Sequence, residues 1–257
     1  MDLFDLSGKI AVVTGASGGL GADAALAYAQ AGADVALLAR RAEKLTGVKA
    51  QIEALGRRAA AIPCDVTDEQ SVKAAVEGVM REFGRIDILL NDAGVAVRGG
   101  VDTLSAEDWD KSFNTNVRGM FLVCKYVVPH MKEQNYGKIV NIASVNAVIA
   151  DKNDVFIRHS YNASKAAVLG LTTGMACSYA RYNITVNAIG PALFETEMTA
   201  NTLFKSEQFL QGYNTLNPSS RPGRKGELNG TVLYLSSDAS SYVQGQFIIV
   251  DGGGSLV

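Results

Sequence analysis

Seven short apolar runs recur along the chain, separated by longer stretches in which apolar residues follow a helical spacing. The runs lie at 9–13, 34–39, 59–66, 86–90, 138–144, 183–189 and 246–251. Apolar runs of this length, bounded by turn residues, are typical of strands that are buried on both faces. The pattern therefore predicts seven strands within a parallel sheet.

The stretches between the runs predict helices that cover the sheet. One helix follows a sequence of capping-box form between Thr67 and Gln70. Its apolar residues share one face, as in a helix packed on a sheet: Val72, Ala75, Val76, Val79, Met80 and Phe83. Strands that alternate with helices predict one α/β domain over residues 1–257, a Rossmann-type doubly wound parallel sheet of seven strands with helices on both faces.

Two irregular stretches, 145–160 and 192–222, interrupt this alternation. Each follows the carboxyl end of a predicted strand, which is the edge where open parallel sheets bind their ligands. Long loops in a compact domain tend to be functional. We therefore expect both stretches to overhang a cleft, and the second to form a substrate lid at about 192–222.

A glycine-rich turn lies between the first strand and an alanine-rich helix that runs to about residue 30. Its glycines are Gly15, Gly19 and Gly21, with Ser17 and Leu20 between them. Glycine lets the backbone approach a pyrophosphate closely, and the helix N-terminus offers free N–H groups to the phosphates. The turn predicts a dinucleotide site, although its spacing differs from the general G-x-G-x-x-G fingerprint.

The second strand ends in Ala39, Arg40 and Arg41. In a Rossmann unit, an acidic residue about 20 positions after the glycines holds the ribose 2′-hydroxyl of NAD. Here no carboxylate would repel a 2′-phosphate, and a guanidinium is present to bind one. This favours NADP over NAD, with Arg40 as the phosphate partner. The alternative is that the two arginines merely open a surface helix.

Polar residues at other strand ends and in one helix are further site candidates. Asp65 ends the third strand and Ser144 ends the fifth. Asn116 lies in an otherwise apolar helical stretch that starts near Ser105 and runs towards Met131. A buried amide must find hydrogen bonds, so Asn116 is either a structural bridge or a site residue.

Tyr161 and Lys165 are four residues apart at the predicted start of a buried helix. Positions i and i+4 share a helix face, so the two side chains point the same way. A free phenol titrates near ~10, and a neighbouring ammonium lowers that pKa by favouring the phenolate. The pair is therefore a candidate acid and base for neutral pH.

Composition narrows the possible partners. The chain has 24 basic and 26 acidic residues and a net charge of −2, which gives no reason to expect nucleic acid or an anionic membrane. No apolar run is long enough to span a bilayer, and the acidic N-terminus is not a secretory signal. Cys64, Cys124 and Cys177 are far apart, which predicts free thiols, no metal site and a cytoplasmic location.

Taken together, the sequence resembles the short-chain dehydrogenase/reductase family over essentially its whole length. The motifs that carry the resemblance are Thr14-Gly15-x3-Gly19-x-Gly21, Asp65-Val66, Asn91-x-Ala93-Gly94, Asn116, Ser144, Tyr161-x3-Lys165, and Pro191 with Thr196. The resemblance implies an enzyme that passes hydride between a nicotinamide and the carbonyl carbon of a secondary alcohol or ketone. It also implies a homotetramer, in which the helices that carry Asn116 and Tyr161 would pair across one interface and residues 247–257 across another.

The resemblance implies a role for each motif residue. Tyr161 would donate or accept the proton, and Lys165 would hold the nicotinamide ribose and lower the tyrosine pKa. Ser144 would hydrogen-bond the substrate carbonyl, and Asn116 would order a proton-relay water. Asp65 would meet the adenine. The implied cofactor contacts are Gly15, Ser17, Gly19, Leu20, Gly21, Arg40, Asp65, Val66, Asn91, Ala93, Gly94, Tyr161, Lys165, Pro191 and Thr196, the last at the carboxamide.

Three features depart from the family pattern. Asp92 replaces the second asparagine of the usual Asn-Asn-Ala-Gly turn, which adds a charge near the cofactor. Ala192 replaces a glycine after the sixth strand. Ser144 and Tyr161 are 161 − 144 = 17 positions apart, longer than is typical, which indicates an insertion around 151–158.

The substrate stays open between three classes. Residues 2–9 and 194–199 look similar to gluconate 5-dehydrogenases, which interconvert a keto-sugar acid and its hydroxy acid. Arg158 and His159 precede Tyr161, and either is a candidate contact for a carboxylate or polyol, or a solvated loop residue. The expected lid instead contains apolar residues that would suit a hydroxysteroid such as a bile acid, or would simply pack the lid down: Leu193, Phe194, Leu203, Phe204, Phe209, Leu210 and Tyr213.

The third possibility is a general ketoacyl reductase, which would act on a ketoacyl substrate. A nucleotide-binding regulator that has lost the chemistry is an alternative from another class. The regulator is disfavoured because all four candidate catalytic residues are present: Asn116, Ser144, Tyr161 and Lys165. The choice among substrates stays open, since a fold alone does not determine its substrate.

Overall fold

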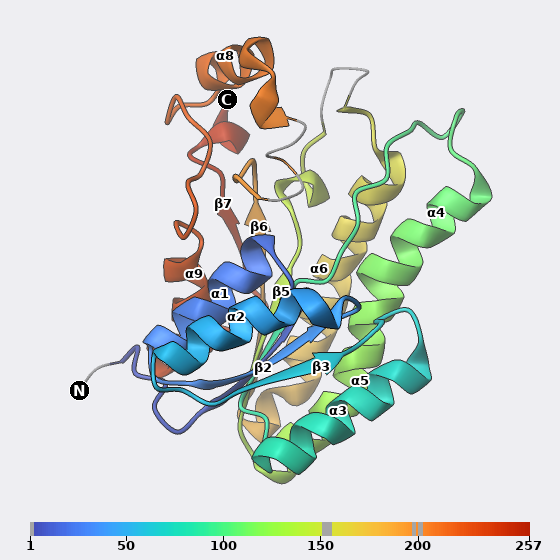
Figure 1. Cartoon of the computed structure of the whole chain (residues 1–257). Helices are drawn as coiled ribbons and strands as arrows, with labels where there is room; N and C mark the ends of the chain where they lie inside the picture. The colour runs from blue at the N-terminus through green and yellow to red at the C-terminus, as the bar shows by residue number, and fades with distance from the viewer. Residues whose placement is uncertain (1–2, 151–155, 197–198, 200–202) are drawn as a thin grey trace.

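A parallel sheet in the strand order β3-β2-β1-β4-β5-β6-β7 forms the centre of the computed structural model (Figure 1). The strands are β1 (Ile10–Thr14), β2 (Asp34–Ala39), β3 (Ala59–Pro63), β4 (Ile88–Asn91), β5 (Gly137–Ile142), β6 (Ile184–Pro191) and β7 (Phe247–Val250). All six strand pairings are parallel, which confirms the predicted sheet. The strand order reverses between β1 and β4, and such a switch point opens a crevice at the carboxyl ends of the strands.

The structure describes residues 3–150, 156–196, 199 and 203–257. Parts of three expected features therefore lie outside the described residues. They are the insertion around 151–158, the lid at 192–222, and the segments 2–9 and 194–199 that resemble gluconate 5-dehydrogenases. In the part of the chain that is described, no helix is long and apolar enough to cross a membrane.

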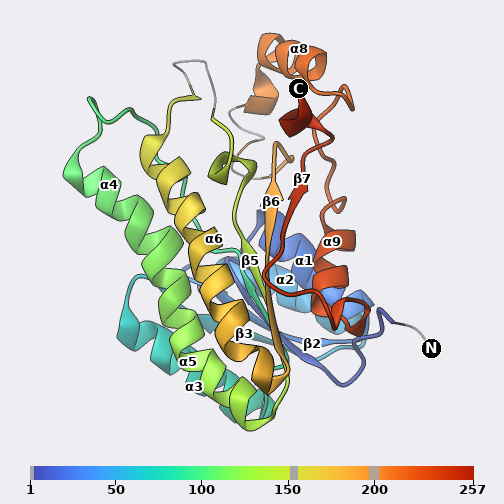
Figure 2. The ribbon, with the colours of Figure 1, turned by 180° about the vertical axis from the view of Figure 1, so that it is seen from behind.

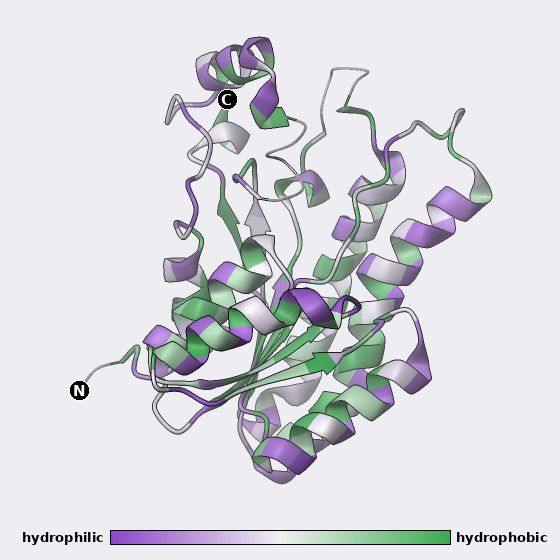
Figure 3. Cartoon of the chain, viewed as in Figure 1, coloured by the Kyte–Doolittle hydropathy of each residue, from purple (hydrophilic) through white to green (hydrophobic). Residues whose placement is uncertain are grey.

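Helices cover both faces of the sheet, as predicted (Figures 1 and 2). On one face lie α1 (Gly19–Gln30), α2 (Ala42–Ala54) and α9 (Asn229–Ser236); on the other lie α3 (Glu69–Phe83), α5 (Gly119–Glu133) and α6 (His159–Tyr179). Hydrophobic residues concentrate in the sheet and on the inner helix faces, and hydrophilic residues on the outer faces (Figure 3). Two apolar cores result, one on each side of the sheet.

The third strand is shorter than the apolar run predicts. Pairing with β2 ends at Pro63, which pairs with Ala39. Two residues later, the backbone N–H of Asp65 donates to Ser71 Oγ over 3.0 Å. The chain has thus left the sheet, and Asp65 lies in the loop after β3 rather than in the strand.

The N-terminus of α3 also differs from the capping-box prediction. The capping residue is Asp68, whose carboxylate accepts from the backbone N–H of Gln70 over 3.0 Å. The Thr67 hydroxyl does not cap the helix; it donates to Asp65 Oδ1 over 2.8 Å. The capping function moved by one residue because the neighbouring carboxylate engages the threonine.

The helical stretch that starts after Ser105 contains a π-helical turn. It runs as α4 (Ala106–Phe113), a π-helix at Asn114–Arg118 and then α5. The backbone N–H of Gly119 donates to the Asn114 carbonyl, five residues earlier. Such π-turns are rare and frequently lie at functional sites, and this one contains Asn116.

The stretch expected to form an irregular lid contains helix α8 (Glu207–Leu216). The helix lies beyond the carboxyl ends of the strands, and the C-terminus of the chain lies beside it (Figures 1 and 2). The prediction of an irregular segment was wrong here, because Ser206 caps the helix by accepting from the Phe209 N–H over 3.2 Å.

Candidate active site

A cleft of about 840 Å³ runs across the carboxyl ends of the strands. It brings together most of the predicted site residues: Gly15, Ser17, Gly19, Leu20, Arg40, Asp65, Val66, Ala93, Gly94, Ser144, Tyr161, Lys165, Pro191 and Thr196. Gly21, Asn91 and Asn116 do not line the cleft and lie behind its wall. Residues far apart in sequence therefore meet at one edge of the sheet, as parallel topology requires.

The glycine-rich turn forms one end of the cleft. Gly15 has a φ of +73°, and a Cβ built there would come within 2.9 Å of the Ala93 backbone nitrogen. No side chain caps α1 at Gly18, and its first turn has no acidic residue. The Gly21 N–H faces the Asp92 carboxylate, whereas the N–H groups of Gly19 and Leu20, which come first in the helix, are a ready anion site. The residues present therefore fit the pyrophosphate of a dinucleotide.

Thr14 is a site residue whose role sequence reasoning missed. Its buried hydroxyl accepts the backbone N–H groups of Asp92 and Ala93 over 3.0 and 3.1 Å. It thereby ties the turn after β4 to the turn after β1. The signal for it was a threonine directly before the glycine turn, at the centre of the sheet.

Arg40 and Asp65 lie at the same end of the cleft as the glycine-rich turn, where β2 and β3 end. Burial on its own would raise the pKa of Asp65. Hydrogen bonds from Thr67 and the positive charge of Arg40 outweigh burial and hold that pKa below its usual range. The arginine and the carboxylate are thus close neighbours, and Arg40 is exposed towards the cleft.

Tyr161 and Lys165 share the N-terminal part of α6. The Lys165 ammonium lies 5.7 Å from the centre of the Tyr161 ring and donates to the Ile142 carbonyl over 2.7 Å. Lys165 is only 5 % exposed. Ser144 begins the 3-10 turn at Val145–Ala147, and its hydroxyl accepts the Asn146 N–H over 3.1 Å. The phenol, ammonium and hydroxyl thus border one region of the cleft.

The Asn116 side chain bridges the wall behind the cleft. Its Oδ1 accepts the Val95 N–H over 2.8 Å, while Nδ2 donates to the Val95 carbonyl and to Ser164 Oγ, each over 2.9 Å. The amide is 1 % exposed. The side chain thus holds the loop after β4 against α6, and the role of Asn116 in ordering a proton-relay water stays a prediction.

Asn91 is buried beneath the site rather than exposed in it. Its Nδ2 donates to Asn141 Oδ1 over 2.9 Å, and Asn141 in turn donates to Thr172 Oγ1 over 2.9 Å. Its own Oδ1 has no partner among the described residues. The network ties β4, β5 and α6 together directly below the cleft, so the contact of Asn91 with a cofactor stays a prediction.

Asp92, the departure from the family turn, lies against the start of α1. Burial raises the pKa of its carboxyl to about 6, although Lys165 and the Gly21 backbone N–H oppose that shift. A Cβ on Gly21 would come within 2.7 Å of Asp92 Oδ2. The carboxylate is therefore packed beneath the glycine turn, where a negative charge is costly.

Asp92→Asn should stabilise the fold at alkaline pH. Because the folded-state pKa lies above that of an unfolded aspartate, the penalty is present above pH 6 and disappears as the pH falls towards 4. The gain at pH 8 should be on the order of 2 kcal/mol for this partly exposed residue. Thermal unfolding at pH 8 and 4.5 checks this, with exposed Asp110→Asn as the control. An equal gain at both pH values would contradict the burial argument.

Aromatic residues from two segments line part of the cleft. The ring of Phe156, just before α6, lies 5.0 Å from that of Phe209 on α8, and Phe209 lies 6.2 Å from Tyr213. All three line the cleft, with Ile149 and Leu193 beside them. Phe156 lies in the segment between Ser144 and Tyr161 that is longer than is typical of the family. Part of that segment therefore forms the cleft wall.

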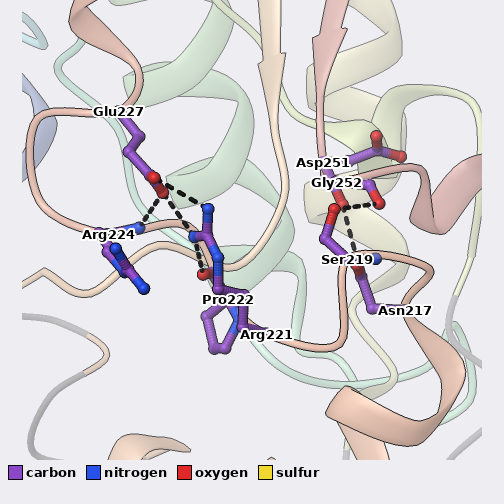
Figure 4. Close-up of polar contacts among 8 residues, drawn as sticks. All are labelled: Asn217, Ser219, Arg221, Pro222, Arg224, Glu227, Asp251 and Gly252. Carbon is purple, nitrogen blue, oxygen red and sulfur yellow. Dashed lines mark hydrogen bonds and ion pairs between the residues drawn. The ribbon is translucent and has the colours of Figure 1, made fainter.

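The end of α8 is fastened to the C-terminal segment (Figure 4). Asn217 Nδ2 donates to the Asp251 carbonyl and Ser219 Oγ to the Gly252 carbonyl, each over 2.8 Å. Further on, Arg221 forms a two-point ion pair with Glu227, with N–O distances of 2.6 and 2.9 Å. Both ends of the loop that follows α8 are therefore fixed.

Comparison with known proteins agrees with this geometry. A family model described as short chain dehydrogenase matches residues 9–206. The gluconate 5-dehydrogenase of Gluconobacter oxydans is 42 % identical over 98 % of this chain and 96 % of that protein. The 3-oxoacyl-[acyl-carrier-protein] reductase of Thermotoga maritima is 37 % identical over 96 % of this chain and 98 % of that protein.

A solved structure is also similar. The crystal structure of a gluconate 5-dehydrogenase from Burkholderia cenocepacia, in complex with NADP and tartrate, has a TM-score of 0.93 and 35 % identity. The similarity covers 100 % of this chain and 98 % of that one.

Proposed function

The chain belongs to the short-chain dehydrogenase family and is an oxidoreductase, and we propose that it transfers hydride between NADP and a hydroxy- or keto-sugar acid such as gluconate or 5-ketogluconate. The observation that carries the proposal is a single cleft that joins the glycine turn and Arg40 at one end to Tyr161 and Lys165 at the other. The similarity to gluconate 5-dehydrogenases supports the substrate class.

The proposed mechanism assigns the proton to Tyr161. When bound, the nicotinamide supplies or accepts the hydride at the carbonyl carbon. During reduction, Tyr161 donates its phenolic proton to the oxygen of the former carbonyl, and the Ser144 hydroxyl hydrogen-bonds the same oxygen as charge develops on it. The Lys165 ammonium favours the phenolate that is left. In the oxidative direction the phenolate removes the alcohol proton.

Arg40 supports the preference for NADP. Arg40→Ala should raise KM for NADPH about 10- to 100-fold, since a hydrogen bond to a charged group contributes about 1.5–3 kcal/mol. KM for NADH should change less than about threefold, because NADH has no 2′-phosphate for the guanidinium to bind. Initial rates with both cofactors test this. An unchanged preference would remove Arg40 from the cofactor site.

The substrate proposal is tested by following reduced nicotinamide with a panel of substrates and both cofactors. Gluconate, other sugar acids and polyols, hydroxylated bile acids, and small ketones in the reverse direction make up the panel. Turnover of gluconate with NADP supports the proposal. Cofactor binding without turnover of any panel member would instead support a nucleotide-binding regulator.

A hydroxysteroid substrate is the second candidate, and the aromatic wall of Phe156, Phe209 and Tyr213 favours it. Such a wall buries apolar rings better than it solvates a polyol. Faster turnover of a bile acid than of any sugar acid would select this candidate. Under either substrate, we propose that residues 192–222 act as the lid.

We also propose a homotetramer. Trp109 on α4 and Phe121 on α5 are 37 % and 48 % exposed, on the helices that the family resemblance assigns to a subunit interface. Exposed aromatic residues on adjoining elements are typical of such surfaces. A light-scattering mass equal to one 27.2 kDa chain would overturn this proposal.

A further inference from the structure

Four cationic side chains line the described part of the cleft: Arg40, Arg41, Arg158 and Lys165. Arg40 and Arg41 follow β2, at the end away from Tyr161. The Lys165 ammonium donates to the Ile142 carbonyl. Arg158 differs, because its guanidinium carbon lies 5.6 Å from the centre of the Tyr161 ring. It therefore places a positive charge in the cleft wall next to the proposed proton donor.

The backbone around Arg158 is held in place by a neighbouring loop. The Gly99 N–H donates to the Ile157 carbonyl over 2.9 Å, and the His159 N–H donates to the Gly99 carbonyl over 3.1 Å. Arg158 and Gly99 form an isolated parallel bridge. The Arg158 Nε donates to the Phe156 carbonyl over 3.3 Å, so the side chain is also tethered within the cleft wall.

The structure separates Arg158 from His159, which the sequence left as equal candidates. His159 Nδ1 accepts the Val101 N–H over 3.0 Å, and His159 does not line the cleft. Its imidazole faces the loop after β4, where it has a structural partner. Arg158 is the member of the pair that lines the cleft.

The surroundings of Arg158 strengthen its attraction for an anion. The aromatic pair Phe156 and Phe209 lines the same cleft as Arg158, and charge pairs interact more strongly beside apolar groups than in water. The carboxylate of Asp251, also in the cleft wall, is occupied by the backbone N–H groups of Gly253 and Ser255. A guanidinium binds a planar carboxylate through two parallel hydrogen bonds.

We propose that Arg158 binds the carboxylate of the substrate and so selects hydroxy and keto acids over neutral alcohols and ketones. The inference deepens the proposed function and rests on it.

The test compares each acid with its own neutral amide. For the acid that wild type turns over best in the panel, Arg158→Met should lower kcat/KM about 100-fold, in line with the loss of a charged hydrogen-bonded pair. For the matched amide, the same variant should change kcat/KM less than about threefold. Arg158→Lys keeps the charge but lacks the planar guanidinium. Its kcat/KM for the acid should lie between those of wild type and Arg158→Met. Arg98→Met, an exposed residue outside the cleft, should leave both values unchanged.

Two results would overturn the inference. Equal losses for acid and amide would mean that Arg158 acts only by packing on Tyr161. Amides turned over as well as acids by wild type would mean that no carboxylate is recognised. The sugar-acid proposal fails separately: if a non-sugar acid is the best substrate and Arg158→Met still discriminates against it, Arg158 keeps its role and only the sugar assignment is lost.

Discussion

Tyr161→Phe should lower kcat about 100- to 10,000-fold while leaving the fold and cofactor affinity unchanged. The substitution removes one oxygen, and a positioned general acid contributes about 10²- to 10⁴-fold. The ring that packs beneath Arg158 and near Lys165 remains, so the loss should fall on kcat and not on binding. Steady-state kinetics with saturating cofactor measure the effect.

Tyr179→Phe is the matched control, since it removes a phenol from the same helix, α6, at its opposite end. Its turnover should equal that of wild type. Tight binding of reduced nicotinamide by Tyr161→Phe, followed by fluorescence, separates lost chemistry from lost structure. If Tyr161→Phe kept more than a tenth of the wild-type rate, the proton would have to come from another group.

Gly15→Ala should have the second-largest effect, on both stability and cofactor binding. Its φ of +73° is unfavourable for any residue with a Cβ. The new atom would also come within 2.9 Å of Ala93 N and 3.1 Å of Ala93 Cα. These are backbone atoms, which cannot rotate away as a flexible side chain would.

We therefore expect Gly15→Ala to destabilise the fold by about 2–4 kcal/mol. The turn after β1 should move away from the turn after β4. The cofactor Kd should then rise at least about 30-fold, because the N–H groups at the start of α1 lose their alignment with the phosphates. Thermal unfolding and fluorescence titration measure the two effects. Wild-type stability and affinity would show that the turns are not in close contact.

Gly47→Ala is the control for glycine replacement in general. Gly47 lies within α2, and a Cβ there meets nothing within 4 Å. Alanine is favoured over glycine in a helix by about 0.5–1 kcal/mol. The same chemical change should thus stabilise the protein at residue 47 and destabilise it at residue 15.

The strand-and-helix alternation, the glycine turn after β1 and the i, i+4 pair on α6 were all predicted from the sequence. Each of these features depends on residues that are close together in the sequence, so a local pattern is enough to predict it. The parallel sheet followed because such strands need helical crossovers. The positions of Gly15, Ser144 and Tyr161 in one cleft then followed from their places at strand ends or helix starts.

The tertiary structure decided which partner each polar side chain uses. Asn116 bonds to Val95, 21 residues away, and His159 bonds to Val101, 58 residues away. The carboxyl of Asp92 lies against the start of α1, which removes it from much of the solvent. No local sequence pattern predicts these contacts, because they join residues that are far apart in the sequence and depend on how separate elements pack. The sequence by itself therefore determined the fold and the candidate residues, whereas only packing decided which side chains face the cleft and which hold its walls.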